Sequence, residues 1–245
     1  SLFPFVMSPC FGYIFHYFHD ICIDNTDNPN TLEDYQIRVV INTSYLISSG
    51  MMRSDCGDIR FSEEMEVCGG DITTSLPYWI KPGTCNTEET EIWVKVPTIP
   101  AKSWKCIRMY FGNPSALSLS NPYSVFEFFD DFDGSSLDTT KWRVDNNGGS
   151  YKVINGYLRM YVGSDSWINI SSIQTFSTSS LVEFESSISG GAYVYIYQGF
   201  ENRRMRNYRD GNGDYQSLCC GSSCSSTSFD TSRNIWGIST SGGTI

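Results

Sequence analysis

The stretch Glu91-Ile92-Trp93-Val94-Lys95-Val96 decides the fold class of this 245-residue chain. Its aliphatic side chains, Ile92, Val94 and Val96, fall on one face of an extended backbone, and the side chains between them fall on the other. A strand that buries one face requires this period of two. The stretch therefore predicts a half-buried β-strand.

The same period recurs along the chain. Segments 36–41 and 106–111 alternate in the same way, and turn-forming residues separate the runs. Asn155-Gly156, between two strand-like runs, is the strongest short hairpin motif. No segment carries an apolar helical stripe longer than two turns. We therefore predict an all-β protein.

One stretch, residues 115–124, is rich in Ser, Asn and Pro and lacks periodicity, which is typical of a domain boundary. We expect an apolar N-terminal segment at 1–19, a β-sandwich domain at 20–120 and a second β-sandwich domain at 125–245.

The composition excludes some classes of binding partner. Asp and Glu number 27 against 17 Lys and Arg, a formal net charge of −10. This charge repels phosphate backbones and anionic membrane surfaces, so nucleic acid is not an expected partner. Charged residues are only 18% of the chain, so much of the polar surface must come from Ser, Thr, Asn and Gly. Such a surface suits sheets joined by many turns.

Nine cysteines indicate disulfides and an oxidising compartment. Cys219, Cys220 and Cys224 resemble half of a zinc knuckle but have no second pair. Cys220 and Cys224 are therefore expected in disulfides, and the odd count leaves at least one thiol free or bonded to another chain. Glycosylation sequons at Asn42 and Asn169 agree with a secreted or cell-surface protein.

Residues 1–19 are apolar and aromatic but broken by prolines, so no membrane span is expected. They also lack the positive start of a signal peptide, which agrees with an already processed N-terminus. We expect the segment to pack against protein, either a neighbouring subunit or the first domain. The expected subunit contacts are Phe3, Phe5, Phe11 and Phe15, with Arg204 and Arg206 from the basic cluster near residue 206.

Several motifs in order resemble a domain of unknown function from archaeal and bacterial surface proteins. The longest is Met52-Arg53-Ser54-Asp55-Cys56-Gly57-Asp58-Ile59-Arg60-Phe61. The others lie at 23–36, 76–80, 92–97 and 109–114. The resemblance covers about residues 20–120 and implies a disulfide between Cys56 and Cys85.

A second resemblance begins at Phe128-Phe129-Asp130-Asp131-Phe132-Asp133-Gly134 and continues through Lys141-Trp142. It is similar to the opening of a concanavalin A-like lectin/glucanase domain, which implies a jelly roll. The segment is shorter than a complete jelly roll, so the second domain is expected to be incomplete.

Catalysis is not expected. Glucanases use two carboxylates facing one cleft, and Glu183 and Glu185 do share a strand face. They lack the further acidic partners of the glucanase motif, so we predict no glycanase activity and assign no catalytic residue.

No cofactor is required by the sequence. Asp130, Asp131 and Asp133 are a candidate site for structural calcium, since grouped carboxylates bind this ion. The alternative is turn formation, in which Asp side chains accept local backbone N–H groups.

Three functions follow as hypotheses. The first is an adhesive, carbohydrate-binding lectin-like module that uses Trp167, Tyr193, Tyr195 and Tyr197. The second is a structural subunit of an extracellular filament, in which neighbouring copies exchange strands into a homopolymer. A glycoside hydrolase is a distant third.

Overall fold

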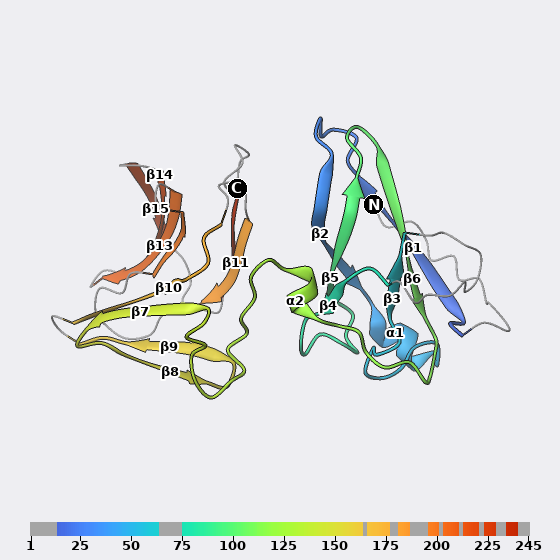
Figure 1. The fold of residues 1–245 in the computed structure, drawn as a ribbon, viewed down its shortest axis with the longest axis horizontal. Coiled ribbons are helices and arrows are strands. Elements are labelled where there is room, and N and C mark those ends of the chain that lie inside the picture. Colours follow the sequence, from blue (N-terminus) through green and yellow to red (C-terminus); the bar gives the residue numbers. More distant parts are fainter. Residues whose placement is uncertain are drawn as a thin grey trace. The chain divides into compact units, whose positions relative to one another are not determined.

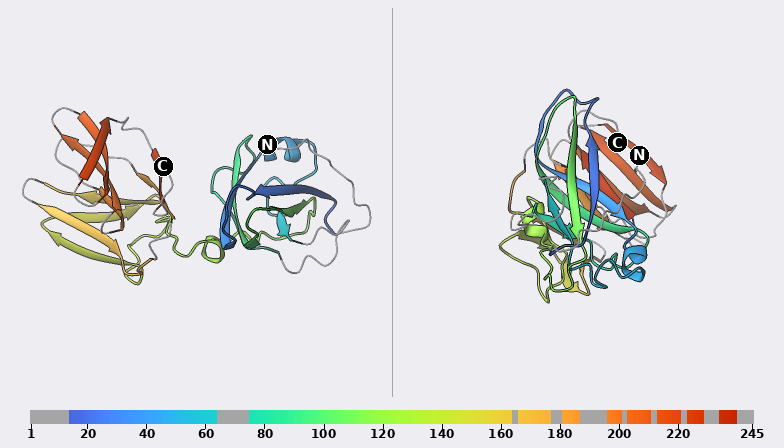
Figure 2. Two further views of the ribbon diagram at one scale, coloured as in Figure 1. Left: turned by 90° about the horizontal axis from the view of Figure 1, so that it is seen from above. Right: turned by 90° about the vertical axis from the view of Figure 1, so that its right-hand side faces the viewer.

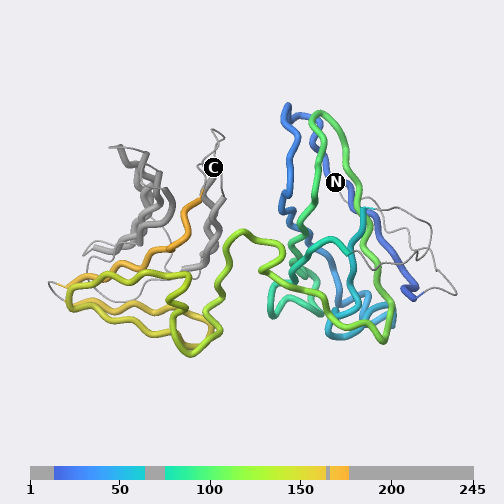
Figure 3. Tube along the Cα trace, viewed as in Figure 1, coloured from blue at the N-terminus to red at the C-terminus, as the bar shows by residue number. Residues whose placement is uncertain are grey.

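The computed structural model describes residues 14–63, 75–163 and 166–176, and the backbone of six further strands between 181 and 239. It divides into two compact units, 1–130 and 131–245, each described here by itself. Figure 1 labels their elements, and Figures 2 and 3 show further views and the course of the chain.

The first unit is a sandwich of two antiparallel sheets. One sheet has the order β1-β6-β3 and the other β2-β5-β4. The bounds are β1 Tyr17–Asp24, β2 Leu32–Ile41, β3 Arg60–Ser62, β4 Tyr78–Ile80, β5 Thr90–Ile99 and β6 Trp104–Phe111. Helix α1, Thr43–Ser48, follows β2. The three segments predicted from their alternation are thus strands β2, β5 and β6.

The core of this unit lies between the two sheets. Val94 and Val96 of β5 are fully buried, as are Ile107 and Phe111 of β6. Phe61 of β3 packs in the same cluster. The alternating faces of the sequence therefore point inward from both sheets, and the predicted β-sandwich is confirmed here.

The N-terminal segment does not stay separate from this sandwich. Strand β1 begins at Tyr17, whose ring stacks on Phe111 at 5.7 Å between centroids. Phe15 is 7% exposed and packs with Tyr110 and Ala116. The boundary expected at residue 20 is thus too late, because residues 17–19 belong to β1. Of the two expected partners of this segment, a neighbouring subunit and the first domain, the structure shows the first domain for residues 14–19. Phe3, Phe5 and Phe11 lie outside the described residues.

The end of the first unit also differs from expectation. After helix α2, Pro122–Val125, Phe126 and Phe129 stack on each other at 5.8 Å. Both rings meet Trp79 edge-on, at 5.7 and 5.0 Å. These aromatic contacts attach the segment to β4, so the first unit continues to Asp130 and the boundary expected at 125 is too early.

The second unit is also all-β. Strands β7 (Trp142–Asn147) and β10 (Trp167–Ser172) pair, as do β8 (Ser150–Ile154) and β9 (Tyr157–Tyr161). Asn155 and Gly156 connect β8 to β9 with φ of 54° and 73°. Both values lie in the left-handed region that this tight turn needs, so the predicted hairpin is present.

Six further strands are antiparallel. β11 (Leu181–Ser186) pairs with β16 (Asn234–Ser239), and four strands form a sheet in the order β12-β13-β14-β15. Those four are β12 Ile196–Phe200, β13 Arg203–Asp210, β14 Gly213–Cys220 and β15 Ser223–Ser228. None of the helices in the described part of the chain is long and apolar enough to cross a bilayer.

Candidate functional site

The sheet of β7 and β10 has one face that is more exposed than the other. In its register Trp167 lies opposite Asn147, and Asn169 lies opposite Asp145. Opposite residues share a face, so these four lie together with the next pair, Ser171 and Arg143. We call this set of six residues the Trp167 face.

The two faces of this sheet differ in exposure. Trp167 is 47% exposed, and Asn147, Asp145 and Asn169 are exposed beside it. On the opposite face Asn146 is exposed, and the other five side chains are half-buried: Ile168, Ile170, Val144, Trp142 and Ser172. The Trp167 face therefore presents one flat aromatic ring among amide, carboxylate and guanidinium groups, an arrangement that can stack on a ring and hydrogen-bond to hydroxyls.

The other predicted ligand-binding residues do not join this face in the described part of the chain. Tyr193 and Tyr195 lie outside it. Tyr197 lies in β12 opposite Arg206 of β13, and Arg204 lies opposite Gly199, with their side chains outside the description. Asp145, Asn147 and Arg143 were missed by sequence reasoning, although polar residues alternate with apolar ones from Trp142 to Asp145.

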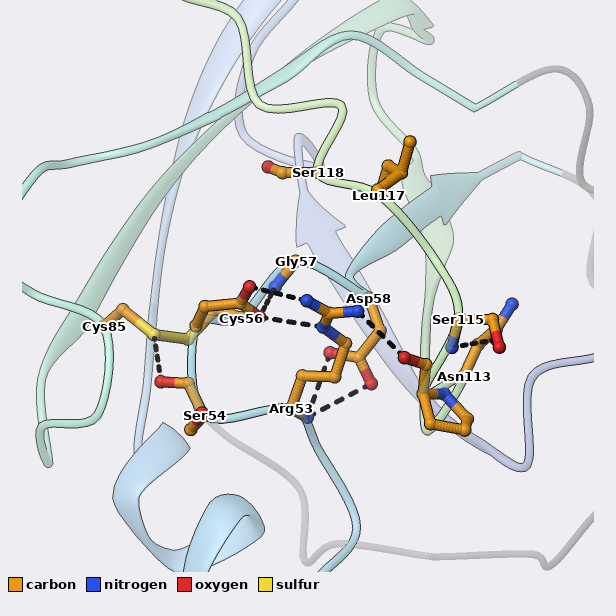
Figure 4. Close-up of polar contacts among 12 residues, drawn as sticks. Arg53, Ser54, Cys56, Gly57, Asp58, Cys85, Asn113, Ser115, Leu117 and Ser118 are labelled. Atoms are coloured by element: carbon orange, nitrogen blue, oxygen red, sulfur yellow. Dashed lines mark hydrogen bonds and ion pairs between the residues drawn. A yellow bond between two sulfur atoms is a disulfide. The ribbon is translucent and has the colours of Figure 1, made fainter.

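In the first unit, the longest motif of the resemblance forms a cross-linked loop (Figure 4). The Arg53 guanidinium makes a bidentate pair with Asp55, with Nε–Oδ1 at 2.9 Å and Nη2–Oδ2 at 2.7 Å. Arg53 Nη1 also donates to the Pro114 carbonyl at 2.8 Å. Cys56 and Cys85 form the disulfide that the resemblance implied. The motif thus joins three segments that are distant in sequence.

Asp58 lies beneath this loop and is completely buried. Its Oδ2 accepts the backbone N–H of Gly112 at 2.7 Å, and its carboxylate accepts the N–H of Arg53 at 3.2 Å. At Gly112 φ is +89°, and a Cβ would lie 2.6 Å from the Tyr17 ring. The motif residues therefore stabilise the end of β6 against the loop, which is a structural task.

Acid should weaken the Arg53–Asp55 pair. The hydrogen bond from Arg53, followed by that from the Gly57 N–H, lowers the pKa of Asp55 from 3.8 to about 2. Its contribution to stability is complete above pH 3.8 and is lost as pH falls towards about 2. Because the side chain is 57% exposed, we expect about 1 kcal/mol or less. Urea unfolding should show this loss in the unaltered protein and not in Asp55→Asn; identical pH profiles would contradict it.

Two further carboxylates of the first unit pair with cations across neighbouring strands. Arg108 of β6 makes a bidentate pair with Asp20, opposite it on β1, at 2.6 and 2.8 Å. Burial raises the pKa of Glu91, but hydrogen bonds from Arg38 and Trp93 and the charge of Lys81 outweigh it, so this pKa lies below its ordinary value. These carboxylates hold strands together.

Sequence reasoning missed one disulfide of the first unit. Cys22 of β1 and Cys106 of β6 are bonded and lie directly opposite each other in the strand register. No local sequence pattern indicates this pair, because it depends on the register of β1 against β6. For the other expected cysteines, Cys224 lies opposite Cys219 and Cys220 lies opposite Ser223. Their side chains lie outside the description.

The remaining candidate residues are placed individually. Asp131 Oδ1 accepts the Asp133 N–H at 3.4 Å, as in the turn alternative. Among the described residues, no group of three or more His, Cys, Asp or Glu side chains, Asp130 included, is arranged to hold a metal ion.

Asn42 caps α1 by accepting the Tyr45 N–H at 2.9 Å. Glu183 and Glu185 share one face of β11, where only the backbone is described.

A family model described as a domain of unknown function (DUF2341) matches residues 55–145. The match includes Asp55–Phe61 and the strands β4, β5 and β6, so part of this chain is similar to that family. It begins later and ends later than the expected span 20–120. The family comparison shows no concanavalin A-like domain. No curated protein and no solved structure matches the chain.

Proposed function

We propose that this chain is a non-catalytic, extracellular carbohydrate-binding module and that the Trp167 face contacts the glycan. The observation that carries the proposal is a tryptophan 47% exposed on a strand face, with Asn147 and Asp145 beside it. An exposed indole stacks on the apolar face of a sugar ring, and planar amide and carboxylate groups fix the hydroxyls around that ring.

The disulfides support the proposed location. The two disulfides among the described residues of the first unit agree with an oxidising compartment, and hence with secretion or display at a cell surface. The similarity to surface-protein domains, stated as a resemblance above, supports the same location.

The test compares two exposed tryptophans. Trp167→Ala should weaken binding to neutral oligosaccharides on a glycan array at least tenfold, because it removes the stacking surface. Trp104→Ala is the matched control, since Trp104 is 53% exposed on β6 of the first unit. The protein should come from a host that leaves Asn169 unmodified, because a sugar there would cover the Trp167 face. Silence of the unaltered protein across the array, or equal losses in both variants, would count against the proposal.

A structural subunit of an extracellular filament is the second candidate. One observation favours it: among the described residues, β7, β8, β9 and β10 each pair with one strand, in two-stranded sheets. Strands with a free edge can accept a strand from a neighbouring copy. Fibres in electron micrographs of the purified protein would favour this function, and monomers without fibres would exclude it.

A further inference from the structure

The outward face of the β8–β9 hairpin carries two cations directly opposite each other. Lys152 of β8 is the register partner of Arg159 of β9, so both side chains leave the same face. Both are exposed. In the part of the chain that the structure describes, neither forms an ion pair.

This pair of like charges destabilises the hairpin. Like charges directly opposite each other on neighbouring strands are destabilising. The chain has 27 acidic residues, yet no described carboxylate neutralises this pair. An anion bound between the two side chains would convert the repulsion into two charge-assisted hydrogen-bonding groups.

Two tyrosines flank the cations on the same face. Tyr157 and Tyr161 lie two residues before and after Arg159, and strand alternation puts all three together. They are 42% and 51% exposed. At about 3.4 Å per residue the two rings are roughly 14 Å apart along the strand. We call Lys152, Tyr157, Arg159 and Tyr161 the hairpin face.

We propose that the hairpin face binds an acidic polysaccharide, with the carboxylate or sulfate groups at Lys152 and Arg159 and the sugar rings against the two tyrosines. A polysaccharide supplies both features, anions and flat apolar ring faces, at intervals along an extended chain. Two cations are fewer than the basic cluster that binds a membrane surface. This surface lies on a different sheet from the Trp167 face and stands independently of it.

The test measures binding of the full chain to polygalacturonate, hyaluronan and heparin by titration calorimetry. We expect binding to at least one, weakening as sodium chloride is raised, because the contact is electrostatic. Fully methyl-esterified polygalacturonate is the matched neutral probe and should bind at least tenfold more weakly than polygalacturonate. Desulfated heparin, which keeps its uronate carboxylates, has a lower charge and should bind more weakly than heparin. An acidic peptide, poly-Glu, should also bind more weakly, since it lacks rings.

Variants distinguish binding at the hairpin face from nonspecific electrostatic attraction to the chain. Arg159→Gln and Tyr161→Ala should each lower the affinity at least tenfold. Lys152→Glu should abolish binding yet leave the melting temperature unchanged or higher, because it places opposite charges across the strands. Arg143→Gln removes the same charge from the Trp167 face, and it should leave binding of the acidic polysaccharides unchanged, as should Trp167→Ala.

Three results would overturn the proposal. The first is absence of binding to all three polysaccharides. The second is equal binding of charged and neutral probes, or tighter binding of poly-Glu. The third is a loss in Arg143→Gln as large as that in Arg159→Gln. Loss of neutral-glycan binding in Trp167→Ala concerns the proposed function alone, so the two failures are distinguishable.

Discussion

Replacing both Cys22 and Cys106 by serine is expected to lower the free energy of unfolding by about 4.5 kcal/mol. The bond joins residues 84 apart in sequence, so it removes much of the freedom of the unfolded chain. The two residues face each other in β1 and β6, and Cys22 is exposed. Serine should therefore fit without disturbing the core, and the effect should come mainly from the lost cross-link.

The second disulfide of the first unit is the control. Cys56 and Cys85 are 29 residues apart, and the same chain-entropy relation gives about 3.5 kcal/mol for their removal. Urea unfolding without reductant should rank the double variants in this order. A Cys22→Ser/Cys106→Ser protein that is as stable as the unaltered one, or more stable than Cys56→Ser/Cys85→Ser, would show that the native strands and not the cross-link determine stability here.

Asp58→Ala is expected to cost about 3 kcal/mol, because the partly buried N–H groups of Arg53 and Gly112 lose their acceptor. The side chain is fully buried, and water cannot easily replace it. The hydrogen bonds that connect the loop to the end of β6 would be lost.

Asp55→Ala is the matched control, three residues earlier in the same loop. Its side chain is 57% exposed, so its loss should cost about 1 kcal/mol or less. Both variants can be compared by urea unfolding at neutral pH. If Asp58→Ala costs no more than Asp55→Ala, the buried carboxylate does not hold the loop.

Local patterns predicted the strands because consecutive residues of a strand point to opposite faces, so a buried face is visible as an alternation in the sequence. Val94 and Val96 are buried where their alternation put them, and Asn155-Gly156 forms its turn. Contacts between distant segments were harder to predict. The partner of Cys22 depends on the register of β1 and β6, which no local pattern contains.

The same limit explains the misplaced domain boundary and the incomplete site. Phe126 and Phe129 read as the start of a new domain, yet they pack on Trp79, which lies far back in the chain. In the candidate site Trp167 was foreseen as an exposed aromatic. Its neighbours Asp145 and Asn147 reach it only through pairing of β7 with β10, so sequence reasoning could not assemble the face.

The bond between Cys22 and Cys106 has a mechanical consequence. In the proposed function the chain holds a ligand at a surface and is pulled along its length, so in the first unit tension would enter near β1 and leave after β6. The cross-link joins these two strands, so the force passes through a covalent bond and bypasses everything between them. The 84 residues of separation, roughly 280 Å of extended chain, therefore cannot be drawn out while the bond is intact. Under load this unit would behave as a short, inextensible link, and reduction would turn it into a long, compliant one.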